Sequence, residues 1–195
     1  AAAIAKRIAA PSGDRIRFNA NRSFITPDGQ EGAVIEVVII DFVSANLFYD
    51  GPFDRGNPQP PGCFAIGEEP SLLVPSMNSP NRQAETCSTC PNNQFGSASN
   101  GTKGKACKNG RKLAVLPPDA DENTDIWTLG VSPTALKNFD GYVASVARTF
   151  GVPPVGVVTT VSLSDAVDYP QLQFSDPKPN DDVAVAFARQ GEARD

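Results

Sequence analysis

The sequence SPTALKNFDGYVASVARTF, residues 132–150, decides the fold class because it predicts one amphipathic helix in a chain otherwise rich in strand patterns. Ser132 is a favoured N-cap, Pro133 suits the first helical position, and Gly151 suits the end of the helix. Apolar residues at spacings of three and four predict a single buried face, made of Leu136, Phe139, Val143, Val146 and Phe150.

Short runs rich in Val, Ile and aromatic residues predict strands on both sides of this helix. They lie at residues 15–18, 33–42, 46–49, 63–66, 113–116, 125–131, 155–163 and 172–174. Eighteen prolines and sixteen glycines indicate many turns. We therefore expect a mostly β (α+β) fold, an OB-like small barrel with one capped helix at 132–150, although a sandwich fits almost as well.

The predicted organisation has three parts. Residues 1–13 form a flexible arm, residues 14–175 form the OB-like domain, and residues 176–195 form a C-terminal tail that could contain a short helix at 182–189. The domain carries a zinc-knuckle insertion at about residues 63–112. No apolar run is long enough to span a membrane, and no secretory signal pattern is present, so we expect a cytoplasmic protein without membrane partners.

Four cysteines are the strongest motif in the chain: Cys63, Cys87, Cys90 and Cys107, spaced C-x23-C-x2-C-x16-C. The CxxC pair at 87–90 lets two thiolates reach one tetrahedral ion, and four thiolates complete a closed site. This pattern predicts structural Zn²⁺ rather than a catalytic metal. Two disulfides, an iron–sulfur cluster or free thiols remain as alternatives.

Positive charge gathers beside these cysteines although the formal net charge of the whole chain is −5. No acidic residue occurs between Thr86 and Pro118, and this stretch contains Lys103, Lys105, Lys108, Arg111 and Lys112. These cations either offset the negative charge of a zinc–thiolate centre or contact phosphates of a nucleic acid.

Aromatic residues complete the predicted nucleic-acid site, because their rings can stack on unpaired bases. The candidates are Tyr49, Phe53, Phe95 and Trp127. Most aromatic side chains in a domain belong to its core, so exposure is expected mainly of Phe53 and Phe95, which lie in polar loops.

Enzymatic activity is not expected. The chain contains no histidine, which excludes Ser-His-Asp and Cys-His nucleophile systems. Asp119, Asp121, Asn123 and Asp125 begin like a calcium loop, but Thr124 and Gly130 stand where glycine and glutamate are required. A metal-dependent nuclease built on these aspartates is a weak rival, since they sit in one short turn.

Two blocks carry a resemblance to a known family: CSTCPNNQFGS at 87–97 and GKACKNGRKLAVL at 104–116. Together with residues 49–53 and 127–150, they resemble a family of bacteriophage proteins regarded as single-stranded-DNA-binding proteins. The resemblance implies an OB-type core with an inserted metal knuckle, acting in the infected cell. The C-terminal residues 190–195 depart from the strongly acidic tail, closing on an aromatic residue, that many replicative single-strand binders have.

The predicted function is sequence-tolerant binding of single-stranded DNA during phage replication or recombination. Single-stranded DNA is the expected partner, with replication or recombination proteins as further ones. The alternative is a structural or adaptor protein whose zinc knuckle mediates protein–protein contact.

Overall fold

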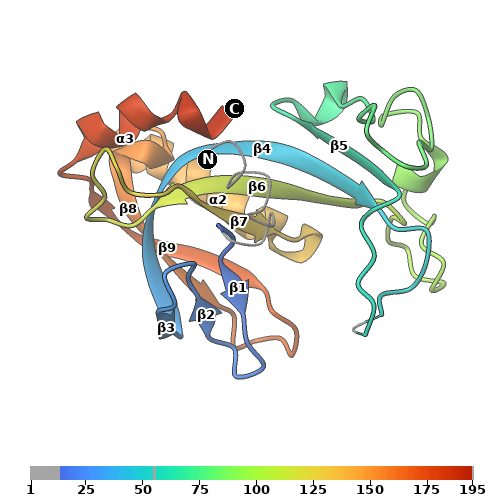
Figure 1. The fold of residues 1–195 in the computed structure, drawn as a ribbon, viewed down its shortest axis with the longest axis horizontal. Helices are drawn as coiled ribbons and strands as arrows, with labels where there is room; N and C mark the ends of the chain where they lie inside the picture. The colour runs from blue at the N-terminus through green and yellow to red at the C-terminus, as the bar shows by residue number, and fades with distance from the viewer. Residues whose placement is uncertain (1–13, 55, 195) are drawn as a thin grey trace, which may run out of the picture. The chain divides into compact units, whose positions relative to one another are not determined.

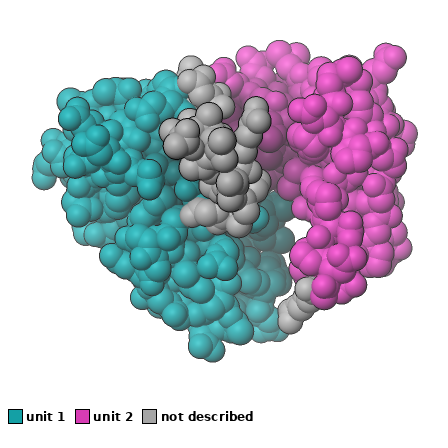
Figure 2. All heavy atoms as spheres, in the orientation of Figure 1, with its two compact units in different colours: residues 1–42, 113–195 teal, residues 43–112 magenta. Residues whose placement is uncertain are grey.

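A computed structural model of the chain describes residues 14–54 and 56–194 (Figure 1). The chain divides into two compact units, coloured separately in Figure 2. Unit 1 comprises residues 1–42 and 113–195, and unit 2 comprises residues 43–112. The flexible arm predicted at residues 1–13 lies outside the described residues.

The largest sheet has the strand order β7-β6-β4-β8-β9, and β5 pairs with β4 off this path. Its strands are β4 (Val34–Phe48), β5 (Cys63–Gly67), β6 (Lys108–Leu116), β7 (Trp127–Val131), β8 (Val157–Leu163) and β9 (Leu172–Pro179). The pairs β4–β5, β4–β8 and β8–β9 are antiparallel. The mostly β fold with one main helix is confirmed. Within the described residues, however, the strand path is open at β7 and β9, so they form no closed barrel.

Strand β4 is longer than its sequence pattern indicated. The pattern predicted separate strands at 33–42 and 46–49, whereas β4 is continuous over 15 residues. Val43, Ser44 and Ala45 carry the strand across the predicted gap, because Ser44 and Ala45 pair with Gly67 and Ile66 of β5. Backbone pairing to a neighbouring strand therefore overrides the weak local pattern.

A second, smaller sheet precedes β4. It contains β1 (Arg17–Phe18), β2 (Phe24–Ile25) and β3 (Glu31–Gly32), paired antiparallel in that order. Ile16 and Phe24 bury their side chains in the main core of unit 1, which fixes this sheet to the rest of the unit.

The predicted helix is present as α2 (Leu136–Phe150), preceded by a single 3-10 turn, η3 (Pro133–Ala135). Gly151 ends the helix as expected, with a left-handed φ of 67° and its N–H bonded to the Ala147 carbonyl. The Ser132 side chain makes no capping bond to the backbone, and its hydroxyl instead meets that of Thr134. The buried residues of α2 are Phe139, Tyr142 and Val146, whereas Phe150 is partly exposed.

Alternation along the strands gives the sheet two buried faces. Val37 and Ile39 of β4 join the larger cluster, which includes the buried face of α2. Val38 and Ile40 point to the opposite side and join a second cluster with Ala186. Ala186 belongs to α3 (Val183–Arg189), so α2 and α3 cover opposite faces of the sheet in unit 1.

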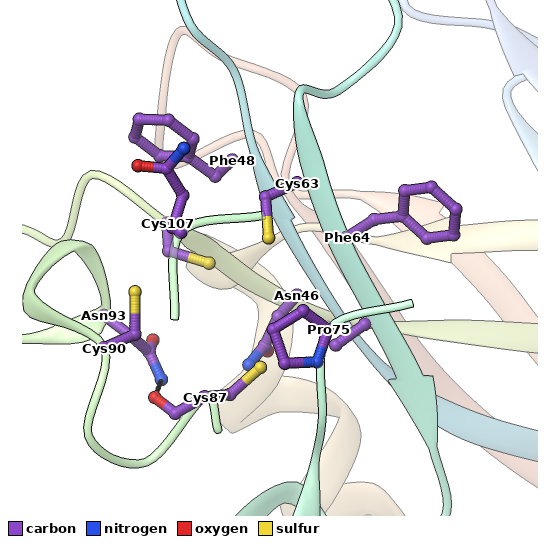
Figure 3. A pocket seen from close by; sticks show the side chains of 11 residues that line it. Asn46, Phe48, Cys63, Phe64, Pro75, Cys87, Cys90, Asn93 and Cys107 are labelled. Atoms are coloured by element: carbon purple, nitrogen blue, oxygen red, sulfur yellow. Dashed lines mark hydrogen bonds between the residues drawn. The ribbon is translucent and has the colours of Figure 1, made fainter. Parts of the chain in front are cut away.

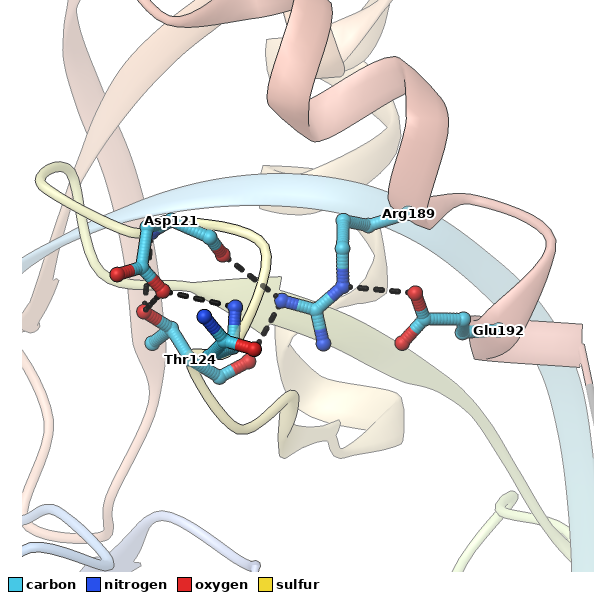
Figure 4. Close-up of polar contacts among 5 residues, drawn as sticks. Asp121, Thr124, Arg189 and Glu192 are labelled. Carbon is cyan, nitrogen blue, oxygen red and sulfur yellow. Dashed lines mark hydrogen bonds and ion pairs between the residues drawn. The ribbon is translucent and has the colours of Figure 1, made fainter.

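The C-terminal segment, predicted as a tail over 176–195, is folded through most of its described length. Strand β9 continues to Pro179, and the predicted helix at 182–189 is confirmed by α3. Arg189 is only 7% exposed; its guanidinium donates hydrogen bonds to the carbonyl oxygens of Asp121 (3.0 Å) and Thr124 (2.6 Å), and its Nε pairs with Glu192 (2.9 Å; Figure 4). Burial of Ala186 and Arg189 explains why the segment docks instead of extending into solvent.

Neither α2, α3 nor any other helix in the described part of the chain is long and apolar enough to cross a membrane.

Replacement of Phe139 tests the main core. Its ring packs edge-on against Phe42 (5.1 Å between centroids) and Phe174 (5.2 Å), and its side chain is fully buried. We expect Phe139→Ala to lower the free energy of unfolding by about 3–5 kcal/mol in urea titrations, because it leaves a cavity. Phe187→Ala on α3 is the control, since Phe187 is half exposed, and it should cost about 1 kcal/mol or less. An equal decrease in the free energy of unfolding in the two variants would contradict this packing.

Candidate metal centre and nucleic-acid interface

The four cysteines of the chain come together in unit 2. All four are free and buried, and all four line one small cavity of about 10 Å³, close to the space of a single water molecule. Figure 3 shows their Sγ atoms directed toward a common space, with Asn46 and Asn93 beside them. The structure therefore brings the four cysteines to one cavity, whereas the zinc ion predicted for them stays a prediction.

Three separate chain segments deliver the thiols. Cys63 begins β5, opposite Phe48 of β4. The CxxC turn is closed by the Cys90 N–H, which donates to the Cys87 carbonyl at 3.4 Å. Cys107 stands directly before β6, and its N–H donates to the Asn92 carbonyl at 2.8 Å. Segments far apart in the sequence thus depend on one another at this cavity.

Three asparagines surround the thiols. Asn109 Nδ2 donates to Asn46 Oδ1 (3.0 Å) and to Asn93 Oδ1 (2.8 Å), and it approaches Cys107 Sγ at 3.9 Å. Asn93 Nδ2 in turn donates to the Cys87 carbonyl at 2.8 Å. The asparagines were not singled out from the sequence, although Asn93 and Asn109 follow Cys90 and Cys107 by three and two positions.

The thiols affect one another electrostatically. Burial is the largest cause that raises the pKa of Cys107, to about 12, and the neighbouring Cys87, Cys90 and Cys63 raise it further. Burial also raises the pKa of Cys87, against which a hydrogen bond from Asn46 acts in the opposite direction. Four thiolates cannot coexist here without a cation, so the apo site favours the neutral thiols.

The donor set suits a soft metal ion, although a formed site is not present. No group of three or more Cys, Asp or Glu side chains within residues 14–54 and 56–194 stands in metal-binding geometry. Four converging thiols without a carboxylate are nevertheless the ligand type that zinc and iron–sulfur clusters take in closed sites. Binding would require the four Sγ atoms to draw in to about 2.3 Å from a zinc ion.

Unit 2 has almost no apolar core apart from these thiols. Within residues 43–54 and 56–112, the buried apolar side chains are those of the four cysteines, Ala65, Leu73 and Pro75. The one hydrophobic cluster found in this part consists of Ala65, Leu73 and Cys87. Such a small core cannot offset the conformational entropy of ordering this many residues, so an additional source of stability is needed.

The predicted cationic residues all belong to unit 2, but they do not share one face. Lys108 and Lys112 are exposed and lie on the same side of β6, whereas Arg111 projects to the other side with Asn109. Lys103 is exposed in the loop before Cys107, and Lys105 is half-buried there. The structure therefore brings Lys105 to the thiol centre and spreads the other four around it.

Among the predicted aromatic residues, two are strongly exposed. Phe53 is 81% exposed and Phe95 is 83% exposed, as their polar loops indicated, and Tyr49 is 43% exposed. Trp127 is only 9% exposed and packs in the main core of unit 1, so its prediction as a base-stacking residue is wrong. Its position at the start of β7, beside apolar Leu129 and Val131 on the same strand face, explains its burial.

Phe95 and Lys105 form a pair beside the cavity. The Lys105 ammonium lies 4.9 Å from the centroid of the Phe95 ring and donates a hydrogen bond to Asn109 Oδ1 at 2.9 Å. An exposed ring next to a fixed cation presents both a stacking face and a charge to an incoming ligand.

The aspartates at 119–125 show a local role. The Asp121 carboxylate accepts hydrogen bonds from the Asn123 N–H (2.8 Å) and the Thr124 hydroxyl (3.0 Å), which lower its pKa. These contacts stabilise the turn that Arg189 also binds. The hydrogen bonds of this turn give the DxDxNxD pattern a structural role.

Thiol counting tests the state of the four cysteines. In denaturant with a chelator but no reductant, we expect dithionitrobenzoate to titrate all four thiols of Cys63, Cys87, Cys90 and Cys107, because none is in a disulfide. In native buffer the reaction should be slow, since burial and a raised pKa both suppress thiolate formation. Fewer than four thiols in denaturant would favour the disulfide alternative.

Known proteins do not assign the chain to a family. It matches no model of a known protein family, and searches of curated proteins and of solved structures found no match. The likeness of the cysteine block to phage single-stranded-DNA-binding proteins therefore stays a prediction, and so do the activity and partners that it implies.

Proposed function

We propose that the chain is a sequence-tolerant single-stranded-DNA-binding protein whose unit 2 is held together by a zinc ion on Cys63, Cys87, Cys90 and Cys107. The observation that carries the proposal is the strongly exposed Phe95 ring with the Lys105 ammonium against it, because Asn109 contacts both Lys105 and the Cys107 thiol. The proposal includes DNA replication or recombination as the setting and partner proteins from those processes.

The order of strands supports an OB-type origin for the sheet. In an OB fold the first strand lies between the second and the fourth, and a helix connects the third strand to the fourth. With β4, β6, β7, β8 and β9 taken as the first to fifth strands, the order β7-β6-β4-β8-β9 fits, and α2 lies between β7 and β8. With this assignment the sheet would be a barrel that stays open between β7 and β9, which do not pair with each other.

This assignment puts the cysteine region in the connection between the first and second OB strands. In OB folds that loop, together with the one between the fourth and fifth strands, contributes to binding oligonucleotides. Residues 49–107 occupy the first of these positions, and 164–171 occupy the second. The insertion therefore lies where an OB fold uses loops for nucleic acid.

Zinc is favoured by the shortage of other stabilising contacts in unit 2. Structural zinc in small thiolate sites contributes about 10–16 kcal/mol of apparent binding free energy at neutral pH, which becomes folding free energy. The thiols of Cys63, Cys87, Cys90 and Cys107 would hold the ion, and the surrounding asparagines would fix the ligands in place. The ion would supply cross-linking of three chain segments and no chemical step.

The charge pattern supports contact with a phosphate backbone. Between residues 86 and 118 every charged side chain is positive, in a protein with a formal net charge of −5. The local excess of five cations exceeds what a zinc–tetrathiolate centre, with about two negative charges, would need. The remainder is available to release counterions from a single strand.

Zinc content and DNA binding on the same preparation test the proposal. We expect one zinc per chain and binding of a labelled oligothymidine of about 16 nucleotides, the upper site size for one OB fold. Affinity should fall steeply with salt, and Lys105→Met should reduce the log–log slope by about 0.7, because one phosphate contact is lost. Lys137→Met, an exposed lysine of α2, is the matched control and should leave the slope unchanged.

Chelation supplies the second arm of this experiment. Removal of zinc should weaken oligothymidine binding and expose the unit 2 thiols together. Absence of zinc, or binding that does not respond to salt in anisotropy titrations, would refute the proposal.

The adaptor alternative is favoured by apolar exposure in unit 2. Ile66, Leu72, Val74 and Met77 are all more than half exposed, which a protein-binding surface would use. This alternative predicts no retention on single-stranded-DNA cellulose, with zinc still present at one ion per chain.

A further inference from the structure

We infer that Asn109 is a positioning residue that couples the thiol centre to a nucleotide subsite formed by Phe95 and Lys105. The inference rests on the proposed function and adds the route by which the metal centre would influence DNA binding. Asn109 makes contacts in both directions: its amide nitrogen reaches Cys107 Sγ, Asn46 and Asn93, and its amide oxygen holds Lys105.

The direction of every hydrogen bond in this network is fixed by its neighbours. Asn93 uses its amide nitrogen on the Cys87 carbonyl, so it offers only oxygen to Asn109. Asn46 Oδ1 accepts a second hydrogen bond from Asn109 Nδ2, at 3.0 Å. Asn109 must therefore present nitrogen to this side and oxygen to the other, where a lysine ammonium, which can only donate, satisfies it.

The opposite orientation of Asn109 is excluded on chemical grounds. A flipped amide would direct oxygen at the Asn46 and Asn93 oxygens and nitrogen at an ammonium group, leaving all three contacts repulsive. Lys105 is thus held at a place determined by the shell around the thiols.

The far end of the network faces solvent. Lys105 uses one of its three N–H donors on Asn109 and places its ammonium 4.9 Å from the Phe95 centroid. The remaining donors suit a phosphate oxygen, and the strongly exposed ring suits an unpaired base. The chemical class recognised here is one nucleotide of a single strand: base on Phe95, adjacent phosphate on Lys105.

The loop that carries this pair is internally braced. Gly96 has a left-handed φ of 88°, which favours glycine, and its N–H meets the carbonyls of Lys103 and Gly104 at 3.0 Å. The Ser97 hydroxyl donates to the Asn92 carbonyl at 3.0 Å and accepts from the Ala106 N–H at 2.9 Å. The loop from Phe95 to Cys107 therefore moves with the segments that hold the thiols.

The consequence is a thermodynamic linkage. If zinc fixes Cys107 and, through it, Asn109, then Lys105 is held in position for a phosphate and the affinity for DNA rises. A bound strand must then raise the affinity for zinc by the same factor. Coupling of this kind is typically about 5–150-fold in affinity. Zinc should therefore tighten oligothymidine binding by at least about 5-fold.

A double-mutant cycle on zinc-dependent oligothymidine binding tests the inference, with the full chain and variants Asn109→Ala, Lys105→Met and both together. Each single variant should reduce the zinc-dependent tightening to below about 2-fold, less than the usual coupling range. The double variant should bind no more weakly than Lys105→Met alone, because the two residues act in series. The control cycle pairs Asn109→Ala with Lys103→Met, an exposed lysine outside the network, and its effects should multiply.

The outcomes separate the inference from the proposed function. The inference would be overturned if the effects of Asn109→Ala and Lys105→Met on oligothymidine affinity multiplied, or if the wild type bound oligothymidine equally well without zinc. DNA binding itself would still hold in either case. A wild-type chain that bound no oligothymidine would overturn both. If Asn109→Ala loses zinc, the Lys105→Met variant decides, because it leaves the asparagine contacts to the thiols in place. The linkage is supported if Lys105→Met retains zinc against a chelator but loses the zinc-dependent tightening of oligothymidine binding. The linkage is refuted if Lys105→Met retains that tightening.

Discussion

The convergence of four buried thiols is the constraint on which unit 2 depends. Apart from these thiols, the described residues of unit 2 bury only the apolar side chains of Ala65, Leu73 and Pro75, and hydrogen bonds join their polar loops. Hydrogen bonds of this kind each add only about 0.5–1.5 kcal/mol net, because the unfolded chain bonds to water instead. The zinc ion proposed above would add a cross-link between these loops.

Unit 1 is stabilised in a different way. Its sheet is covered on both faces, with Val37 and Ile39 directed to the α2 side and Val38 and Ile40 to the α3 side. Unit 1 therefore has an ordinary apolar core, and the chain leaves it along β4 and returns along β6. Exposed side chains of unit 2 such as Phe95 bury little surface, so they contribute little to stability.

Much of the fold could be predicted from local patterns. The helix at 132–150, its end at Gly151, and the strands around it follow from periodicity and from the conformational preferences of Ser, Pro and Gly. What failed depended on distant partners. Trp127 is buried because its strand face meets the core, the segment after 175 docks because Arg189 finds carbonyl partners near 121–124, and β4 is continuous because β5 pairs with it.

In the candidate site, the four cysteines could be recognised from the sequence, whereas the residues around them could not. Four cysteines with a CxxC pair indicate a shared centre from spacing alone, whereas the roles of Asn46, Asn93 and Asn109 depend on contacts across 16 and 63 positions. Local sequence carries no signal for such pairings. The five cations could be recognised in the sequence as a group. Which of them lies near the thiols, Lys105, could not be predicted, because that depends on its contact with Asn109.

X-ray absorption at the zinc edge of the metal-loaded protein tests the central claim most directly. We expect a first shell of four sulfur atoms at about 2.3 Å, with no nitrogen or oxygen neighbours, because the chain has no histidine and the cavity offers only thiols as ionisable donors. A shell with fewer than four sulfurs, or with oxygen in it, would contradict a centre shared by Cys63, Cys87, Cys90 and Cys107.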